Sequence, residues 1–168
     1  MYNNINIMDL LNTNKETIII TGGTGFIGSH TCVELAGFYN IVIIDNFSNS
    51  HRGVVSKLKI LVGDFILYDE DLLNYEKIDN LFQEHKPKAV IHFAGLKSVG
   101  ESISKPLKYY ENNLVSTLNL LKTMEKHKCY NLIFSSSATV YGNQKSPLDE
   151  TMNIGQGITN PYGETKFM

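Results

Sequence analysis

Five short, largely apolar runs recur along the chain and constrain its fold more than any other feature. They are separated by segments with helical patterns, and they lie at residues 17–21, 41–44, 65–68, 89–93 and 132–135. Runs that are apolar at successive positions are typical of parallel strands that are buried on both faces by helices. The alternation therefore predicts an α/β fold with a doubly wound parallel sheet.

The segments between these runs carry helix boundary residues. We expect short helices over about 29–36 and 54–61, each ended by a glycine, and a third from a cap at Asn74 to a break at Pro87. A longer helix is expected over about 107–127. The apolar residues near one stripe of this helix, which predict its buried face, are Tyr110, Leu114, Leu118, Leu121 and Met124.

Composition argues against several classes of function. The chain has 168 residues, enough for one domain with a core, and its net charge of −2 gives no general attraction to nucleic acid or anionic membranes. No apolar run approaches the roughly 20 residues of a membrane span. Cys32 and Cys129 lack a metal-binding spacing, so we expect free buried thiols and no metal site. Free thiols, without an apolar leader, predict a cytoplasmic protein.

A glycine-rich turn follows the first apolar run and opens a helix. Gly22, Gly25 and Gly28 would allow a tight turn and a close approach of the backbone to a pyrophosphate at the helix N-terminus. Asp45 ends the second run, where a carboxylate can bind an adenosine ribose and repel a 2′-phosphate. The pair predicts a site for NAD rather than NADP. The alternative is that Asp45 merely caps a turn.

A proton-transfer site is indicated near the end of the chain. Tyr162 and Lys166 are spaced one helical turn apart, behind a cap at Asn160. A tyrosine is a weak base at neutral pH unless a nearby cation stabilises its phenolate, which the lysine can do. Ser137, at the end of the fifth run, can hold a reacting hydroxyl beside the tyrosine. The alternative is an exposed helical pair without function.

Four stretches, at 21–30, 45–50, 92–102 and 135–142, make the chain resemble the extended short-chain dehydrogenases/reductases, and among these the UDP-glucose 4-epimerase family. The resemblance covers about residues 17–168. Lys97, in the third stretch, is its most specific element, because a lysine in that loop is characteristic of hexose epimerases.

In this family an acidic residue after the third strand commonly contacts adenine. Asp64 and Asp71 are the two candidates, and they lie before and after the third run. Ligands bind at the carboxyl ends of parallel strands, so we expect Asp71 to contact adenine and Asp64 to lie far from the cofactor.

The resemblance implies which residues bind the dinucleotide and the sugar. The implied NAD-binding residues are Gly22, Gly25, Phe26, Ile27, Gly28, Asp45, Asn46, Phe47, Ser48, Asn49, Ser50, Asp71, Leu72, Phe93, Ala94, Gly95, Leu96, Lys97, Asn112, Tyr162 and Lys166. Ser137 and Tyr162 match the substrate-binding positions, and Tyr162, Lys166 and Ser137 match the catalytic ones.

The implied reaction interconverts UDP-glucose and UDP-galactose on a retained NAD, in a homodimeric parent enzyme. Related dehydratases carry an acidic pair soon after the serine, where this chain has Ala138 and Thr139. This difference argues against dehydration.

Intact members of the family are about twice as long, and their later half supplies most uridine and sugar contacts. We therefore expect a polar extension over residues 1–15 and an incomplete Rossmann-type domain over 16–168, truncated before the last strands and without a substrate domain. Alone, such a chain is expected to have little epimerase activity. The alternatives are an inactive dinucleotide-binding module and another sugar-nucleotide-modifying member of the family.

Overall fold

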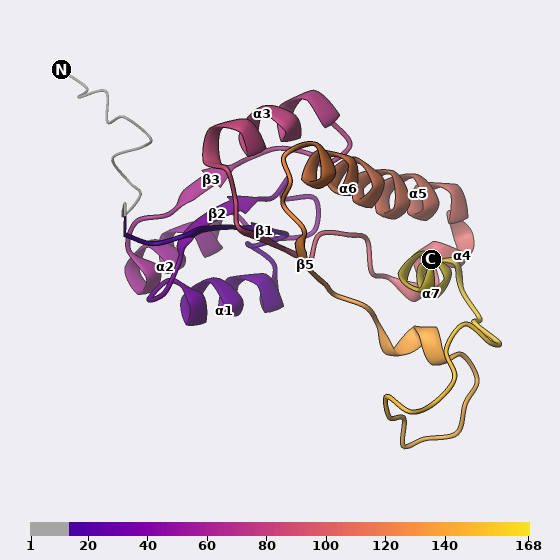
Figure 1. Cartoon of the computed structure of the whole chain (residues 1–168). Helices are drawn as coiled ribbons and strands as arrows, with labels where there is room; N and C mark the ends of the chain where they lie inside the picture. The colour runs from indigo at the N-terminus through magenta and orange to yellow at the C-terminus, as the bar shows by residue number, and fades with distance from the viewer. Residues whose placement is uncertain (1–13) are drawn as a thin grey trace. The chain divides into compact units, whose positions relative to one another are not determined.

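A computed structural model describes residues 14–168, and its central feature is a five-stranded, entirely parallel sheet (Figure 1). The strand order is β3-β2-β1-β4-β5. The strands are β1 (Thr17–Thr21), β2 (Asn40–Ile44), β3 (Ile66–Tyr68), β4 (Ala89–His92) and β5 (Asn131–Phe134). Each lies within one residue of its predicted bounds. The extension predicted for residues 1–15 lies outside the described part of the chain, except for residues 14 and 15.

The chain divides into two compact units. The first combines the described residues up to Ala94 with Asn119–Phe134 and contains the whole sheet. The second combines Gly95–Leu118 with Ser135–Met168. Each unit therefore consists of two segments that are distant in the sequence.

Helices cover both faces of the sheet in the first unit, which confirms the predicted α/β fold (Figure 1). One face carries α1 (Phe26–Leu35) and α2 (Gly53–Val62). The other carries α3 (Tyr75–His85) and the later part of α6 (Ser116–Lys126). Helix α1 begins three residues earlier than predicted. The sequence suggested a loop there because Gly25 and Gly28 flank the first turn, but Gly28 is itself helical.

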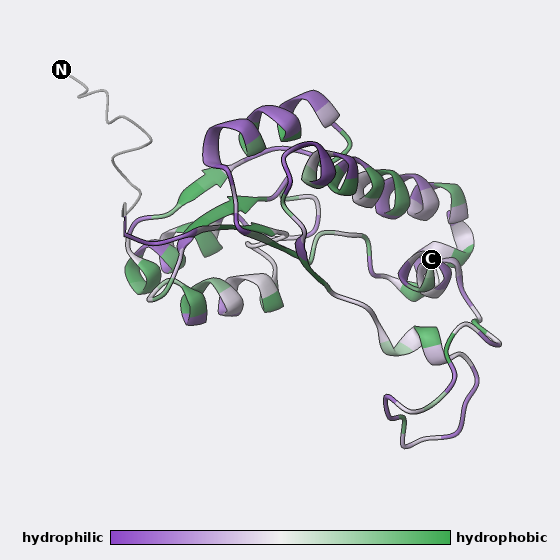
Figure 2. Cartoon of the chain, viewed as in Figure 1, coloured by the Kyte–Doolittle hydropathy of each residue, from purple (hydrophilic) through white to green (hydrophobic). Residues whose placement is uncertain are grey.

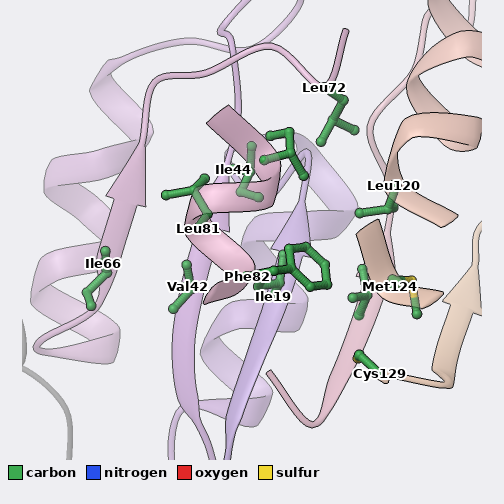
Figure 3. Packing of buried hydrophobic residues seen from close by; sticks show 12 residues of the cluster. Ile19, Val42, Ile44, Ile66, Leu72, Leu81, Phe82, Leu120, Met124 and Cys129 are labelled. Atoms are coloured by element: carbon green, nitrogen blue, oxygen red, sulfur yellow. The ribbon is translucent and has the colours of Figure 1, made fainter. Parts of the chain in front are cut away.

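Two hydrophobic clusters fill the space between the sheet and its two helical layers. The cluster under α3 and α6 includes Ile19, Val42 and Phe82 (Figure 3). The cluster under α1 and α2 includes Ile18 and Ile43. Neighbouring residues of one strand thus enter opposite clusters, as expected for strands buried on both faces. The strands of the sheet are hydrophobic, whereas the outer side of α3 is hydrophilic (Figure 2).

The second unit consists of short helices and loops. Its elements are α4 (Val99–Ser104), α5 (Pro106–Tyr110), a π-helical turn η2 (Glu111–Val115), a 3₁₀ helix η3 (Ala138–Tyr141) and α7 (Pro161–Phe167). Helix α7 contacts α4, α5 and η3. It therefore packs against three other elements of its own unit.

The long helix predicted over about 107–127 is present as α5, η2 and α6 in succession, but most of its predicted buried stripe is wrong. Leu118 and Leu121 are 53% and 41% exposed. Of the predicted stripe only Met124 is fully buried, and the other buried positions are Tyr109, Asn113, Ser116, Leu120 and Thr123. Three of these are polar residues with internal hydrogen-bond partners, so hydrophobic spacing did not reveal them.

No helix within residues 14–168 combines the length and apolar character that crossing a bilayer requires.

Candidate dinucleotide and proton-transfer site

The glycine turn joins β1 to α1 at the point where the sheet order reverses, because β1 pairs with β2 on one side and with β4 on the other. Ligands of open α/β sheets bind at such a point. Gly22 has a φ of +68°, and a Cβ on it would lie 2.7 Å from the Ala94 nitrogen. A Cβ on Gly28 would lie 2.3 Å from the Gly22 carbonyl oxygen. The turn therefore requires glycine at both positions.

The first turn of α1 presents donors without a helical partner. Gly25 caps the helix with no side-chain hydrogen bond, and the first N–H groups of any helix lack an intrahelical acceptor. Phe26 and Ile27 in this turn are 76% and 59% exposed. Unpaired donors and the helix dipole together favour an anionic group. The tight turn and the helix start without a side-chain cap fit the pyrophosphate of a dinucleotide.

Asp45 lies directly after β2, and its buried carboxylate connects the glycine turn to the loop that follows. One oxygen, Oδ2, accepts a hydrogen bond from the Thr24 N–H at 3.0 Å. The other, Oδ1, accepts from the Phe47 N–H at 2.9 Å and from the Ser50 hydroxyl at 3.0 Å. Asp45 is therefore a turn-capping residue, as its alternative interpretation supposed. A carboxylate has about four acceptor positions, so Oδ2 retains one for a ribose hydroxyl.

The loop at residues 45–50 also reaches the end of β3. Asn46 donates its side-chain N–H to Asp71 Oδ2 at 2.8 Å, and the Leu73 N–H donates to Asp71 Oδ1 at 2.8 Å. Asp71 follows β3 at its carboxyl end, whereas Asp64 precedes the strand and is exposed. The structure thus brings Asp71, and not Asp64, to the loop that holds Asp45.

Arg52, which belongs to no recognisable motif, follows the same loop. The Arg52 guanidinium stacks over the Phe47 ring at 4.3 Å from its centroid and forms an ion pair with Asp69. Phe47 itself has a φ of +55°. A cation above an aromatic ring contributes roughly 0.5–1 kcal/mol at an exposed site. No sequence pattern indicated this contact, because it depends on the path of the loop.

In the second unit, Ser137 is fixed by hydrogen bonds to Thr139. The Ser137 hydroxyl oxygen caps η3 by accepting from the Thr139 N–H at 3.2 Å, and it accepts from the Thr139 hydroxyl at 2.9 Å. A serine hydroxyl has two acceptor positions and one donor. With both acceptor positions occupied, the Ser137 O–H is oriented to donate to a further group, such as an oxygen of a ligand.

Tyr162 and Lys166 lie one turn apart on α7. The predicted cap is confirmed, because Asn160 Oδ1 accepts from the Gly163 N–H at 2.8 Å and Pro161 occupies the first helical position. Tyr162 is buried. Burial lowers the pKa of the Lys166 ammonium to about 8, because desolvation disfavours its charged form. The pair is therefore not the exposed helical pair of the alternative interpretation.

Asn113, a residue absent from the sequence-based site, connects three parts of the second unit. Its Oδ1 accepts from the Leu96 N–H at 2.8 Å, and its Nδ2 donates to the Leu96 carbonyl at 3.0 Å. The same Nδ2 donates to the Thr165 hydroxyl at 3.0 Å, next to Lys166. The predicted residue Asn112 donates to Asn113 Oδ1 at 3.1 Å. The surrounding helix contains several other polar residues, so its sequence did not single out Asn113.

The loop that carries Lys97 is held by a second network. The Ser98 N–H donates to the Tyr109 hydroxyl, which donates to Glu101, both at 3.1 Å. Lys105 and Lys108 both pair with Glu101. Hydrogen bonds from both lysines and Tyr109 lower the pKa of the Glu101 carboxyl, with Lys108 contributing most. Lys97 itself is exposed.

Comparison with known proteins places the chain in a family. Residues 18–168 match the NAD dependent epimerase/dehydratase family, so the chain belongs to that family. It is 52% identical over 154 residues to the UDP-glucose 4-epimerase of Bacillus subtilis and 51% identical over 162 residues to that of Homo sapiens. The alignments cover 90% of this chain but 45% and 46% of those proteins.

Solved structures give the same result. The chain superposes on the UDP-glucose 4-epimerase of Bifidobacterium longum, solved with NAD⁺ and UDP, with a TM-score of 0.85 at 46% identity. That match covers 89% of this chain and 45% of the other. The chain thus spans a little under half the length of the relatives it matches.

Proposed function

We propose that this chain supplies the NAD-binding and proton-transfer part of a UDP-glucose 4-epimerase. The observation that carries the proposal is one continuous family match over residues 18–168, which contains both the glycine turn and the Ser137, Tyr162 and Lys166 positions. The relatives named above are epimerases of this kind, and one was solved with NAD⁺ and UDP. The tight turn and the exposed first turn of α1 support NAD as the cofactor.

Bound NAD would supply reversible hydride acceptance at C4 of the hexose in UDP-glucose or UDP-galactose. The phenolic oxygen of Tyr162 takes the proton from the 4-hydroxyl of the sugar. After the 4-keto sugar has rotated to present its other face, Tyr162 returns the proton to the oxygen at C4. Lys166 stabilises the phenolate through its ammonium. Ser137 donates its O–H to the sugar oxygen at C4, because both of its acceptor positions are already used by Thr139.

The remaining assignments follow from position. Asp45 binds the adenosine ribose and disfavours a 2′-phosphate, and Asp71 with Leu72 lies beside adenine. Ala138 and Thr139, which follow Ser137, offer no acid for removing water from the sugar. This absence favours epimerisation over dehydration.

A chimera tests the reaction without depending on the ends of this chain. Residues 18–168 would replace the matching part of the Bacillus subtilis relative, and conversion of UDP-galactose to UDP-glucose would be measured. Tyr162→Phe should reduce turnover by at least ~100-fold while bound NAD persists. Tyr130→Phe, at an exposed position of the first unit, is the matched control and should have no effect. A chimera that holds NAD but does not epimerise would contradict the proposal.

We propose that the enzyme is cytoplasmic and forms homodimers. The two free cysteines, Cys32 and Cys129, are both buried, which suits a reducing compartment. In the second unit, large apolar side chains are exposed at Val99, Ile103, Leu107, Val115 and Leu118. A second copy of the chain would bury them. Analytical ultracentrifugation of the chimera should show a dimer, and Leu107→Glu should shift it toward the monomer. A chimera that remains monomeric at high concentration would argue against this assembly.

A further inference from the structure

The segment after β3 that carries Asp71 and Leu72 is held from two sides. From the side of β2, the Asn46 amide donates to Asp71 Oδ2. From the side of α6, the Asn119 amide donates to two successive backbone carbonyls, those of Leu72 and Leu73, at 3.1 Å each. All of these residues belong to the first unit, which the structure defines as one compact body.

The Asn119 contact is fixed by the core on both of its sides. Leu120, the next residue on α6, is fully buried, and Leu72 is 5% exposed. Both side chains belong to the same hydrophobic cluster, which Figure 3 shows. A buried neighbour on each side determines where the amide and the two carbonyls meet. The hydrogen bonds are therefore a consequence of the packed fold and not of a freely rotating surface side chain.

We infer that Asn119 is a positioning residue for the adenine end of the dinucleotide site. The inference rests on the proposed NAD binding. Asn119 contacts neither cofactor nor substrate in this role. It holds the backbone of Leu72 and Leu73, and through that backbone it sets the place of the Asp71 carboxylate beside adenine. Its sequence position among leucines of a helix gave no indication of such a role.

The chemistry of the base provides a specific readout. Adenine carries a 6-amino group that can donate a hydrogen bond to the Asp71 carboxylate, whereas hypoxanthine carries an oxygen there. Nicotinamide hypoxanthine dinucleotide therefore gains no hydrogen bond from a carboxylate placed opposite position 6, because its donor on that edge is the neighbouring N1–H. The ratio of the two affinities reports where this carboxylate lies, and a general loss of stability lowers both affinities alike.

The experiment compares three variants of the 168-residue chain by calorimetric titration with NAD and with the hypoxanthine dinucleotide. Asn119→Ala removes the amide, and Asn119→Asp keeps its shape but has no donor. The matched control is Asn131→Ala, because Asn131 also donates its amide to a backbone carbonyl, that of Lys88 at 3.0 Å, but at the amino end of β4 and β5. Thermal unfolding of each variant is recorded alongside.

Without the two Asn119 hydrogen bonds, Asp71 is no longer held beside adenine, and the loss of one hydrogen bond of ordinary strength to the base should weaken NAD binding about 3- to 10-fold in both Asn119 variants. Binding of the hypoxanthine dinucleotide should change by less than about twofold, so the preference for NAD falls, and the control should match the unsubstituted chain. The inference would be overturned if the Asn119 variants kept their NAD affinity or lost affinity equally for both dinucleotides. It would also be overturned if the unsubstituted chain bound NAD no more tightly than the hypoxanthine dinucleotide. An unsubstituted chain that does not bind NAD would overturn the proposed function and this inference together.

Discussion

Replacing Gly28 with alanine should destabilise the chain and abolish tight NAD binding, because the added methyl group has no space. Its Cβ would lie 2.3 Å from the Gly22 carbonyl oxygen, 2.8 Å from the Gly23 Cα and 3.0 Å from the Gly22 carbonyl carbon. All three atoms are backbone atoms, so no flexible side chain can move aside. The turn would have to shift by nearly 1 Å, and this turn is where the pyrophosphate is proposed to bind.

The expected magnitude combines two opposing terms. Overpacking against rigid neighbours costs about 1–3 kcal/mol, and the upper part of that range applies here. Alanine in place of glycine inside a helix returns up to about 1 kcal/mol. The net loss of about 2 kcal/mol corresponds to a decrease in Tm of roughly 4–8 °C for a chain of this size.

The assay is thermal unfolding by circular dichroism together with a calorimetric NAD titration. Gly37→Ala is the matched control, because a Cβ at Gly37 meets nothing within 4 Å and its φ is not positive. That variant should be neutral or more stable by about 0.4–1 kcal/mol, with normal NAD binding. If Gly28→Ala melts and binds NAD like Gly37→Ala, the close-packing argument is wrong.

Two further predictions concern the titration of Lys166 and the aspartate proposed to lie beside adenine. Burial lowers the pKa of Lys166 from 10.5 to about 8 in the folded chain, so between about pH 8 and 10.5 the unfolded chain binds more protons and stability should rise with pH. Measured by urea unfolding, the free energy of unfolding of the unsubstituted chain should rise by on the order of 3 kcal/mol over this pH range relative to that of Lys166→Met. A stability difference between the two chains that does not change with pH would refute this prediction. In calorimetric titrations Asp71→Ala should weaken NAD binding and Asp64→Ala should not, whereas the reverse ranking would show that the adenine end was assigned to the wrong acid.

The parallel sheet was predictable because its strands are apolar at successive positions, which few other structures require. The start of α1 was not, because Gly25 and Gly28 resemble loop residues until the close packing of the turn is known. The buried face of the long helix was mostly mispredicted for a related reason. Asn113 is buried because distant partners, the Leu96 backbone and the Thr165 hydroxyl, satisfy its amide, and no local pattern records those partners. Thr123 is buried with its hydroxyl bonded to the Asn119 carbonyl one helical turn earlier, so its polarity does not predict exposure.

The residues of the candidate site also fall into those that could be predicted from the sequence and those that could not. Residues that belong to a motif and are proposed to contact a ligand, such as Tyr162 and Asp45, could be predicted from their spacing. Residues that hold other residues in place, such as Asn113 and Asn119, could not. Their side chains act on backbone groups from 17 to 47 positions away in the sequence, and only the folded chain brings these together.

The three hydrogen bonds accepted by Asp45 bear on any attempt to redesign the cofactor preference of this scaffold. The usual substitution, an uncharged residue in place of the acid, would remove the repulsion of a 2′-phosphate. It would also release the Thr24 and Phe47 N–H groups and the Ser50 hydroxyl together. The proposed selectivity and the order of the loop would both depend on this one carboxylate, so an engineered NADP-dependent variant would need compensating acceptors before it needs a new positive charge.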